Sequence, residues 1–373
     1  HLYTNLSRLE EYLLDIAPED ALQIKRLIRS MRKIQQFEIP PEIKTLPKYY
    51  SLKQKISSIK HLPLLLFMLR NRYVTNFTFA GKLKNPFLRE AFQLLFDGEE
   101  VPLVIFTIPL AMADTKGTGY PVGGSLRFAE RIADRYLALG GKINYQSGVK
   151  EVSVENNTAK GVMLENGQQI ASDITVSAAD WYFTVFRALK GTYVNRKLLE
   201  LRDGKRFEVY YSVINVSLGI SRSLNHLSHY SRFPVPHDLV SPDGTVYKRV
   251  ELHVYNYDPT LAPEGKTSVS ASFYTRNGEY WIALRENDPD QYKMVKKAFA
   301  KKVIDLLDEK VGGIKEFVEE MDVATPATFN RYTHNWKGSV QGWLPGKNIM
   351  ASSPVGFELP GLKNFYYCSH WSM

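Results

Sequence analysis

Residues 117–128 read GTGYPVGGSLRF, and a helical pattern, FAERIADRYLALGG, overlaps their end. Glycines occupy the first, third and seventh positions of this stretch, one residue too widely spaced for the G-x-G-x-x-G loop that cradles a dinucleotide pyrophosphate. That loop also needs a strand running directly into its glycines. Here residues 114–116 separate the glycines from the preceding apolar run, and Pro121 stiffens the turn. We therefore reject a Rossmann fingerprint at this position.

What remains is a helix whose first turn is presented by Gly123 and Gly124, with Ser125 as a candidate N-cap. The N–H groups and the dipole of such a helix start can face an anion or the edge of a flavin. The glycines can equally serve only to let the helix pack tightly against a neighbour. The residues by themselves leave both interpretations open.

The composition is that of a globular protein, since 44% of the 373 residues are hydrophobic and 23% are charged. The longest apolar runs, at 62–69 and 101–113, are too short to span a bilayer. A single cysteine, Cys368, excludes a disulfide framework and favours a reducing, cytoplasmic compartment. We expect Cys368 to be a small buried strand residue rather than a reactive thiol.

The positive charge is concentrated in one region. Residues 43–89 contain ten Lys or Arg and no Asp or Glu, and large apolar residues lie between the bases. Bases interleaved with apolar bulk suit a peripheral membrane surface, although a solvated basic face over a buried helix would look the same. No nucleic-acid-binding motif accompanies the bases, so we do not expect a nucleic acid as partner.

The periodicity of the apolar residues changes along the chain. It predicts helices over 4–17 and 21–34, short strands over 142–180, and a second sheet region built from 207–220 and 247–275. We expect an irregular loop at 221–244 and an amphipathic helix at 290–312.

Six segments, in this order, resemble the phytoene dehydrogenase family of flavoprotein oxidoreductases, which includes carotenoid desaturases and isomerases and the retinol saturases. The segments are LSRLEEYLLDIAPEDALQIKRLI (6–28), GYPVGGSLRFAERIADRYLALGGKINYQSGVKEV (119–152), GVMLENGQQIASDITVSAAD (161–180), YDPTLAPEGKTSV (257–269), VATPATFNRYTHNWKGSVQGW (323–343) and LPGLKNFYYCSHW (359–371). Family members begin with a G-x-G-x-x-G strand and end with a glycine-rich helix. Neither occurs in this sequence, so we expect an internal fragment of a longer carotenoid-biosynthesis type of enzyme, inactive alone.

The resemblance implies an α/β architecture: a partial Rossmann-like FAD-binding domain, a mixed-sheet substrate domain and a helical lid. We divide the chain accordingly. Residues 1–110 form the helical lid or membrane-facing region, 111–190 belong to the FAD-binding domain, 191–345 form the mixed-sheet substrate-binding domain, and 346–373 return a strand to the FAD domain.

The same resemblance implies the site residues. The cofactor-binding candidates are Val149, Ala178, Ala179, Asp180, Gly123 and Gly124, and the substrate-binding candidates are Arg331, Tyr332, Trp336 and Gly338. Each also has an ordinary structural explanation: the valine can be core, an aromatic side chain is more often core than catalytic, and Asp180 can simply cap the helix that follows it. The family often has Asn-Ala-Asp where this chain has Ala178-Ala179-Asp180, which leaves any contact of that asparagine in doubt.

No catalytic residue and no metal site is assigned. His226 and His229 form an H-x-x-H pair, but they lie in a stretch rich in serine and proline rather than on a fixed element. A flavin accepts a hydride itself, so the protein needs to supply mainly alignment and burial.

The expected function is that of a peripheral membrane, FAD-dependent oxidoreductase. It would desaturate, saturate or isomerise carbon–carbon bonds of a lipophilic polyene or isoprenoid such as a carotenoid or retinoid. Whether NAD(P) serves as the electron partner is left open by the sequence. Two alternatives also stay open: a non-catalytic lipid-binding or membrane-docking protein, and an amine-oxidase-like flavoenzyme with a polar substrate.

Overall fold

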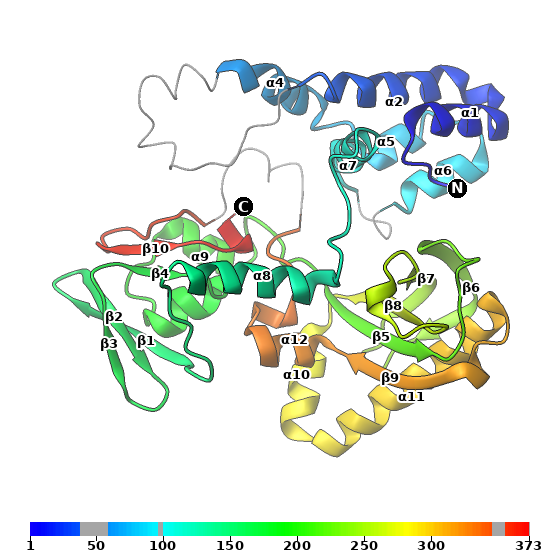
Figure 1. Cartoon of the computed structure of the whole chain (residues 1–373). Helices are drawn as coiled ribbons and strands as arrows, with labels where there is room; N and C mark the ends of the chain where they lie inside the picture. The colour runs from blue at the N-terminus through cyan, green and yellow to red at the C-terminus, as the bar shows by residue number, and fades with distance from the viewer. Residues whose placement is uncertain (38–58, 96–99, 345–354, 373) are drawn as a thin grey trace. The chain divides into compact units, whose positions relative to one another are not determined.

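The computed structural model describes residues 1–37, 59–95, 100–344 and 355–372, and it divides the chain into two compact units (Figure 1). His1–Tyr120 make up most of the first unit. Pro121–Leu344, together with the C-terminal residues, make up the second unit. Each unit has a hydrophobic core of its own.

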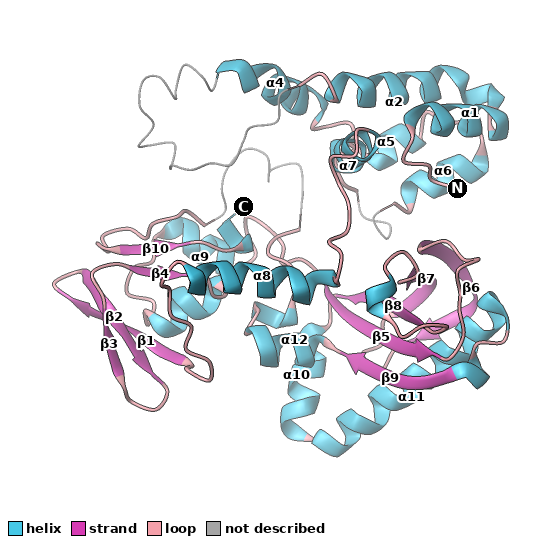
Figure 2. Ribbon diagram, in the orientation of Figure 1, coloured by secondary structure: helices cyan, strands magenta, loops and turns pink. Residues whose placement is uncertain are grey.

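The described part of the first unit is helical (Figure 2). Its α-helices are α1 (Leu6–Ile16), α2 (Ala21–Ile34), α4 (Leu62–Asn71), α5 (Asn76–Ala80), α6 (Pro86–Gln93) and α7 (Val104–Asp114). The two helices predicted from the first 34 residues are confirmed. Their apolar residues, spaced three and four apart, form buried stripes such as Leu6, Leu9 and Leu13 on α1.

The second unit contains three sheets, and two of them are small. Strands β1 (Val149–Glu155), β2 (Thr158–Leu164) and β3 (Gln169–Ala171) form an antiparallel sheet, as the short strands predicted over 142–180 require. Asn156 and Asn157 make the two-residue turn between β1 and β2 with φ of 49° and 56°, the left-handed backbone that such hairpins need. Strand β4 (Thr175–Ser177) pairs in parallel with β10 (Phe365–Tyr367), which is the returning strand.

The largest sheet has the order β6-β7-β8-β5-β9. Its strands are β5 (Ser212–Ile220), β6 (Tyr230–Val240), β7 (Val246–Val254), β8 (Thr267–Thr275) and β9 (Val318–Ala324). We expected a mixed sheet in this region, but its pairings are all antiparallel, and the parallel pairing lies in β4 and β10. Apolar side chains of β5 share one core with Phe299, Val303 and Leu307 of α11.

Three helices accompany this sheet: α10 (Gly278–Asn287), α11 (Pro289–Leu307) and α12 (Pro326–Thr333). Helix α11 confirms the amphipathic helix predicted over 290–312, and a π-helical turn extends it to Gly312. A shorter helix, α9 (Arg196–Arg202), precedes β5.

The prediction of an irregular loop at 221–244 was wrong over part of its length, because Tyr230–Val240 form strand β6. The two prolines in this strand, Pro234 and Pro236, are tolerated because β6 lies at the edge of the sheet and, among the described strands, pairs with β7 alone. The register shifts between Pro234 and Leu239, where the pairing is interrupted.

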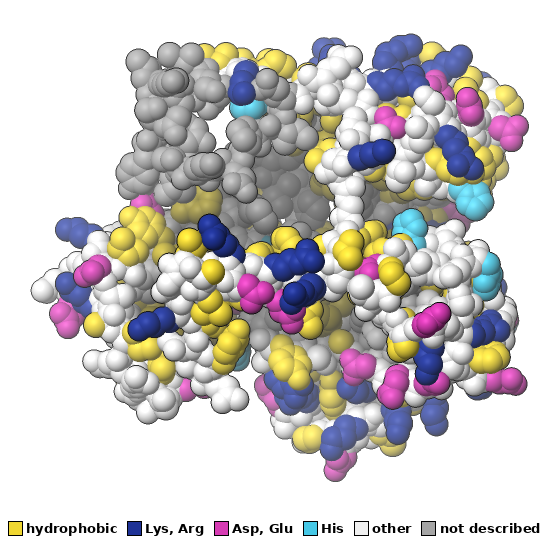
Figure 3. All heavy atoms as spheres, viewed as in Figure 1, with side chains coloured by type: hydrophobic (Ala, Val, Ile, Leu, Met, Phe, Trp, Pro, Cys, Tyr) yellow, Lys and Arg dark blue, Asp and Glu magenta, His cyan; other side chains and the backbone are white. Residues whose placement is uncertain are grey.

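Helix α8 (Gly124–Ala138) is the helix predicted from FAERIADRYLALGG, yet no side chain in it is buried. Leu126, Phe128 and Ile132 are more than half exposed, and Figure 3 shows hydrophobic and basic side chains at the surface over this helix.

Cys368 is exposed, and the prediction that it is buried was wrong, because it lies one residue beyond the end of β10. Within the described ranges, no helix has the length and hydropathy to span a membrane.

Candidate functional site

Asp180 joins two segments that lie 156 residues apart in the sequence. Its side chain is 3% exposed and follows β4, at the start of a helical turn. Oδ1 accepts the backbone N–H of Phe183 at 2.8 Å, and Oδ2 accepts that of Trp336 at 2.9 Å. The capping role that we gave as the ordinary structural alternative for Asp180 is therefore present, and the same carboxylate binds the backbone of Trp336, one of the predicted substrate-binding residues. The cofactor-binding role of Asp180 stays a prediction.

Burial controls the ionisation of this carboxyl group. Desolvation raises the pKa of Asp180 above its ordinary value, although the backbone N–H groups of Phe183, Trp336 and Tyr182 and the charge of Arg187 act in the opposite direction. A buried carboxyl with a raised pKa is one of the features that mark functional sites, but ordinary buried caps also produce it.

An aromatic cluster surrounds this point. The rings of Trp181, Trp336, Trp343 and Trp371 lie with centroids 5.0 to 6.5 Å apart. Tyr182 stacks on Trp336 at 5.1 Å with an interplanar angle of 3°. The cluster brings the end of the β4 segment, the segment after α12 and the C-terminal segment into one contiguous core.

Two indole N–H groups of this cluster have no hydrogen-bond partner within the described part of the chain. Trp181 and Trp371 are both 0% exposed, and their Nε1 atoms are unpaired. Trp343, by contrast, donates from Nε1 to the carbonyl oxygen of Trp371 at 3.0 Å. Buried donors without partners are rare in folded proteins, so these two are candidates for contact with a bound group.

The glycines of the segment G-S-V-Q-G (338–342) are explained by close backbone packing. Gly338 has φ of +69°, and a β-carbon there would lie 2.6 Å from the carbonyl oxygen of Pro326. At Gly342 a β-carbon would lie 2.8 Å from the carbonyl oxygen of His370. Packing alone thus accounts for Gly338, and its substrate-binding role stays a prediction.

The predicted glycine turn forms a second group. Gly123 is the N-cap of α8 with φ of +88°, and its backbone N–H donates to Oδ2 of Asp258 at 2.7 Å. Ser125 is not the cap, because the helix already begins at Gly124 and no side chain of its own end caps it. A β-carbon on Gly124 would lie 3.1 Å from Cδ2 of Leu261.

Two segments that carry the family resemblance, 119–152 and 257–269, therefore contact each other through Gly123 and Asp258. We assigned no role to Asp258 from the sequence, although it begins the D-P-T motif. The signal was present in that motif, but nothing local to it indicates a partner 135 residues away.

The remaining predicted residues show ordinary structural settings. Arg331 and Tyr332 are exposed at the end of α12, with the guanidinium 4.3 Å from the centre of the tyrosine ring. Ala178 and Ala179 are exposed, and the carbonyl of Ala179 accepts the hydroxyl of Tyr367 at 3.3 Å. Val149 begins β1 opposite Leu164. No contact of these residues tests the roles we assigned to them.

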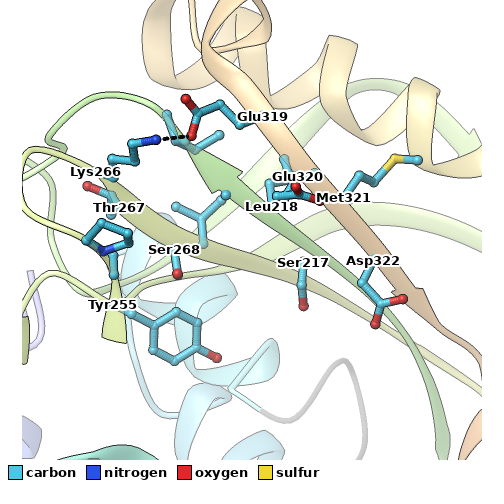
Figure 4. Close-up of a pocket in the computed structure, with 15 residues that line it drawn as sticks. Ser217, Leu218, Tyr255, Lys266, Thr267, Ser268, Glu319, Glu320, Met321 and Asp322 are labelled. Carbon is cyan, nitrogen blue, oxygen red and sulfur yellow. Dashed lines mark hydrogen bonds and ion pairs between the residues drawn. The ribbon is translucent and has the colours of Figure 1, made fainter. Parts of the chain in front are cut away.

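A hollow of about 480 Å³ lies elsewhere, on β5, β8 and β9 (Figure 4). Tyr255, Ser217 and Ser268 line it, together with an ion pair of 2.5 Å between Lys266 Nζ and Glu319 Oε2. None of the predicted site residues lines this hollow. The described residues contain no group of three or more His, Cys, Asp or Glu side chains arranged to hold a metal ion.

Comparisons with known proteins give sequence relatives, although no protein-family model matches the chain. Prolycopene isomerase from Daucus carota is 26% identical over 273 residues, covering 68% of this chain and 42% of the relative. The neurosporene-forming phytoene desaturase of Cereibacter sphaeroides is 26% identical over 293 residues, covering 74% of this chain and 55% of the relative. The chain spans 40 to 50% of the length of the prolycopene isomerases that it matches.

Solved structures show the same fold at lower sequence identity. An oxidoreductase from Methanosarcina mazei aligns with a TM-score of 0.50 and 17% identity, covering 95% of this chain and 68% of that one. A redesigned putrescine oxidase aligns with a TM-score of 0.53 and 11% identity, covering 94% and 70%. These likenesses confirm the α/β fold class.

Proposed function

We propose that this chain, which belongs with the phytoene dehydrogenase-like oxidoreductases, forms part of an FAD-dependent enzyme acting on carbon–carbon bonds of a lipophilic polyene or isoprenoid. The observation that carries the proposal is the set of sequence relatives, which are named as carotenoid desaturases and isomerases. Desaturation, saturation and isomerisation are the three reactions to distinguish.

The residues present suit a flavin in two respects. The unpaired indole N–H groups of Trp181 and Trp371 are donors, and a flavin ring offers acceptors along its polar edge. The turn at Gly123 and Gly124 carries no side chain, so a flat ring could approach its backbone closely. We assign the adenine side to Val149 and the ring side to residues 178–180 and the glycine turn.

When bound, the flavin would supply the hydride chemistry. The chain's own residues would orient the substrate against the flavin and exclude water from the site. The four indoles and Tyr182 form a packed wall that excludes water beside Asp180, and the carboxylate holds the backbone of Trp336 in place. In this proposal Trp336 and Gly338 face the substrate side, with Arg331 and Tyr332 at its outer rim.

We also propose that the basic region at 43–89 docks on an anionic membrane surface from which the apolar substrate is taken. Helix α4 supports this, because it is made almost entirely of apolar residues and has no buried one. Ile59, Leu62, Leu65 and Leu66 are each at least 45% exposed, next to Lys60 and Arg70. Residues 43–58 of the predicted region lie outside the described residues.

The test of the enzyme proposal is a visible absorption spectrum. The 373-residue chain and the longest polypeptide that its reading frame encodes would each be purified and supplied with FAD. We expect flavin absorption bands in the longer form. We also expect the longer form to convert phytoene or prolycopene in liposomes, which chromatography of the extracted polyenes would detect. Bleaching of the flavin band by NADPH would identify NAD(P) as the electron partner. A colourless protein that takes up no FAD in either form contradicts the proposal.

A further inference from the structure

Helix α8 begins at two glycines, and a side chain from a distant part of the sequence binds the first of them. Gly123 and Gly124 both have positive φ, +88° and +72°, a backbone region that residues with a β-carbon rarely adopt. No side chain of the helix's own end caps it. The turn has one backbone hydrogen bond of its own, from the N–H of Gly124 to the carbonyl oxygen of Pro121 at 3.0 Å. A side chain from elsewhere adds a second bond: Asp258, which follows β7 in the large sheet, accepts the N–H of Gly123 at 2.7 Å.

Asp258 is itself held firmly. Its side chain is 5% exposed, and Oδ1 accepts both the N–H of Thr260 at 2.9 Å and its hydroxyl at 2.7 Å. Both carboxylate oxygens are therefore acceptors at the same time, which an asparagine cannot reproduce because one of its two groups is a donor. The N–H of Gly123, followed by the hydroxyl and the N–H of Thr260, lowers the pKa of Asp258 below its ordinary value, so it is charged at neutral pH.

The same short segment also contacts the second glycine. Leu261 packs against Gly124 closely enough that a β-carbon on the glycine would lie 3.1 Å from Cδ2. The helix that follows buries none of its side chains, so packing of its own faces does not fix its position within the described chain. The D-P-T-L segment (258–261) is thus placed to hold both residues of the turn.

We propose that Asp258 is a positioning residue that fastens the glycine turn, and with it the first turn of α8, to the large antiparallel sheet. We call the hydrogen bond between Asp258 and Gly123 the latch, and its existence does not depend on the proposed enzyme activity. Only its consequence rests on the proposed function: a turn beside the flavin would be set by a residue of the substrate-side sheet, so the two sides of the site would keep a fixed spacing.

Residue-resolved hydrogen exchange on the 373-residue chain, without flavin, tests the latch. In Asp258→Ala we expect the amide of Gly123 to exchange on the order of tenfold faster or more, because a hydrogen bond to a charged acceptor is lost. Amides of β5 and β8 should keep their protection. The matched control is Thr260→Val, which removes one donor to Oδ1 and leaves the bond to Gly123 in place.

Asp258→Asn provides the conservative variant. Its carbonyl can still accept the N–H of Gly123, so we expect exchange at Gly123 between that of the wild type and that of Asp258→Ala. If Asp258→Ala loses protection over the whole sheet, Asp258→Leu replaces it, because leucine has a similar volume and offers no acceptor for the N–H of Gly123. Unchanged exchange at Gly123 in whichever of these two variants folds would overturn the proposed contact.

A second readout separates the latch from the enzyme proposal. In any form of the protein that binds FAD, Asp258→Ala should change the visible circular dichroism of the flavin, whereas Thr260→Val should not. Failure of every form to bind FAD would remove the proposed function and leave the exchange result standing.

Discussion

Asp180 illustrates how one buried carboxylate can act over a long sequence distance. It caps the turn that starts at Trp181 and also holds the backbone of Trp336. Because desolvation raises the pKa of Asp180, the folded chain binds this proton more tightly than the unfolded chain does. The resulting stabilisation is fully present below the unfolded pKa of about 3.9 and is lost as the pH rises through the higher folded pKa.

We therefore expect Asp180→Asn to remove a pH dependence. From about pH 4 to pH 7, the free energy of unfolding of the wild type should fall relative to that of the variant. Urea unfolding of both proteins across this pH range measures the difference between their unfolding free energies. The contributions of the other carboxyl groups are common to both proteins and cancel in this difference. Parallel curves for Asp180→Asn would contradict the prediction.

Asp243 has a structural role in the same unit. It lies in the turn between β6 and β7 and accepts the hydroxyl of Thr275 at 2.9 Å and Nε1 of the buried Trp281 at 2.7 Å. Asp243→Ala leaves the indole N–H of Trp281 unpaired, so we expect a loss of about 2–4 kcal/mol of unfolding free energy. Chemical denaturation measures it. The exposed neighbour Asp238→Ala should change stability by less than about 0.5 kcal/mol, and an equal loss in both would contradict the assignment.

Among the elements, α4 differs from its neighbours in leaving its apolar residues at the surface. The helices α1 and α2 bury their apolar stripes against each other and against α7, whereas α4 buries none of its residues. An exposed apolar helix with bases beside it is the arrangement by which an interfacial helix binds a lipid surface.

We expect the chain to co-sediment with phosphatidylserine-containing vesicles and much less with phosphatidylcholine vesicles. Leu65→Asp/Leu66→Asp should weaken this binding roughly tenfold, since both the apolar contact and the charge balance are changed. Leu139→Asp, at an exposed leucine of the second unit, is the matched control. Equal binding by both variants would show that α4 is not the docking element.

At the scale of the whole molecule, the two cores are separate. One contains Ile28 and Met31 of the helical unit, and the other contains Phe299 and Val303 together with the large sheet. Separate cores predict two units that lose stability independently.

Ile28→Ala and Val303→Ala test this independence, because both residues are 0% exposed in different cores. Each truncation should cost about 1–5 kcal/mol in its own unit. Hydrogen exchange should show faster opening in α1 and α2 for Ile28→Ala, and in β5 and α11 for Val303→Ala. Acceleration of both units by either change would indicate a single cooperative body.

Local patterns determined the parts of this protein whose cause lies within a few residues. The stripes of α1 and α2, the hairpin turn at Asn156 and Asn157 and the capping carboxylate of Asp180 follow from spacing and turn chemistry alone. The order of the motifs also indicated the family, which the sequence relatives support.

Only the tertiary structure decided which distant residues meet. It showed Tyr230–Val240 as an edge strand, paired β4 with β10, and brought Asp258 to Gly123 and Trp336 to Asp180. The roles given to Val149, Arg331 and Tyr332 stay predictions. The physical reason is that a helix or turn is stabilised by neighbours along the chain, whereas a contact across more than a hundred residues depends on how the sheets and helices pack around it.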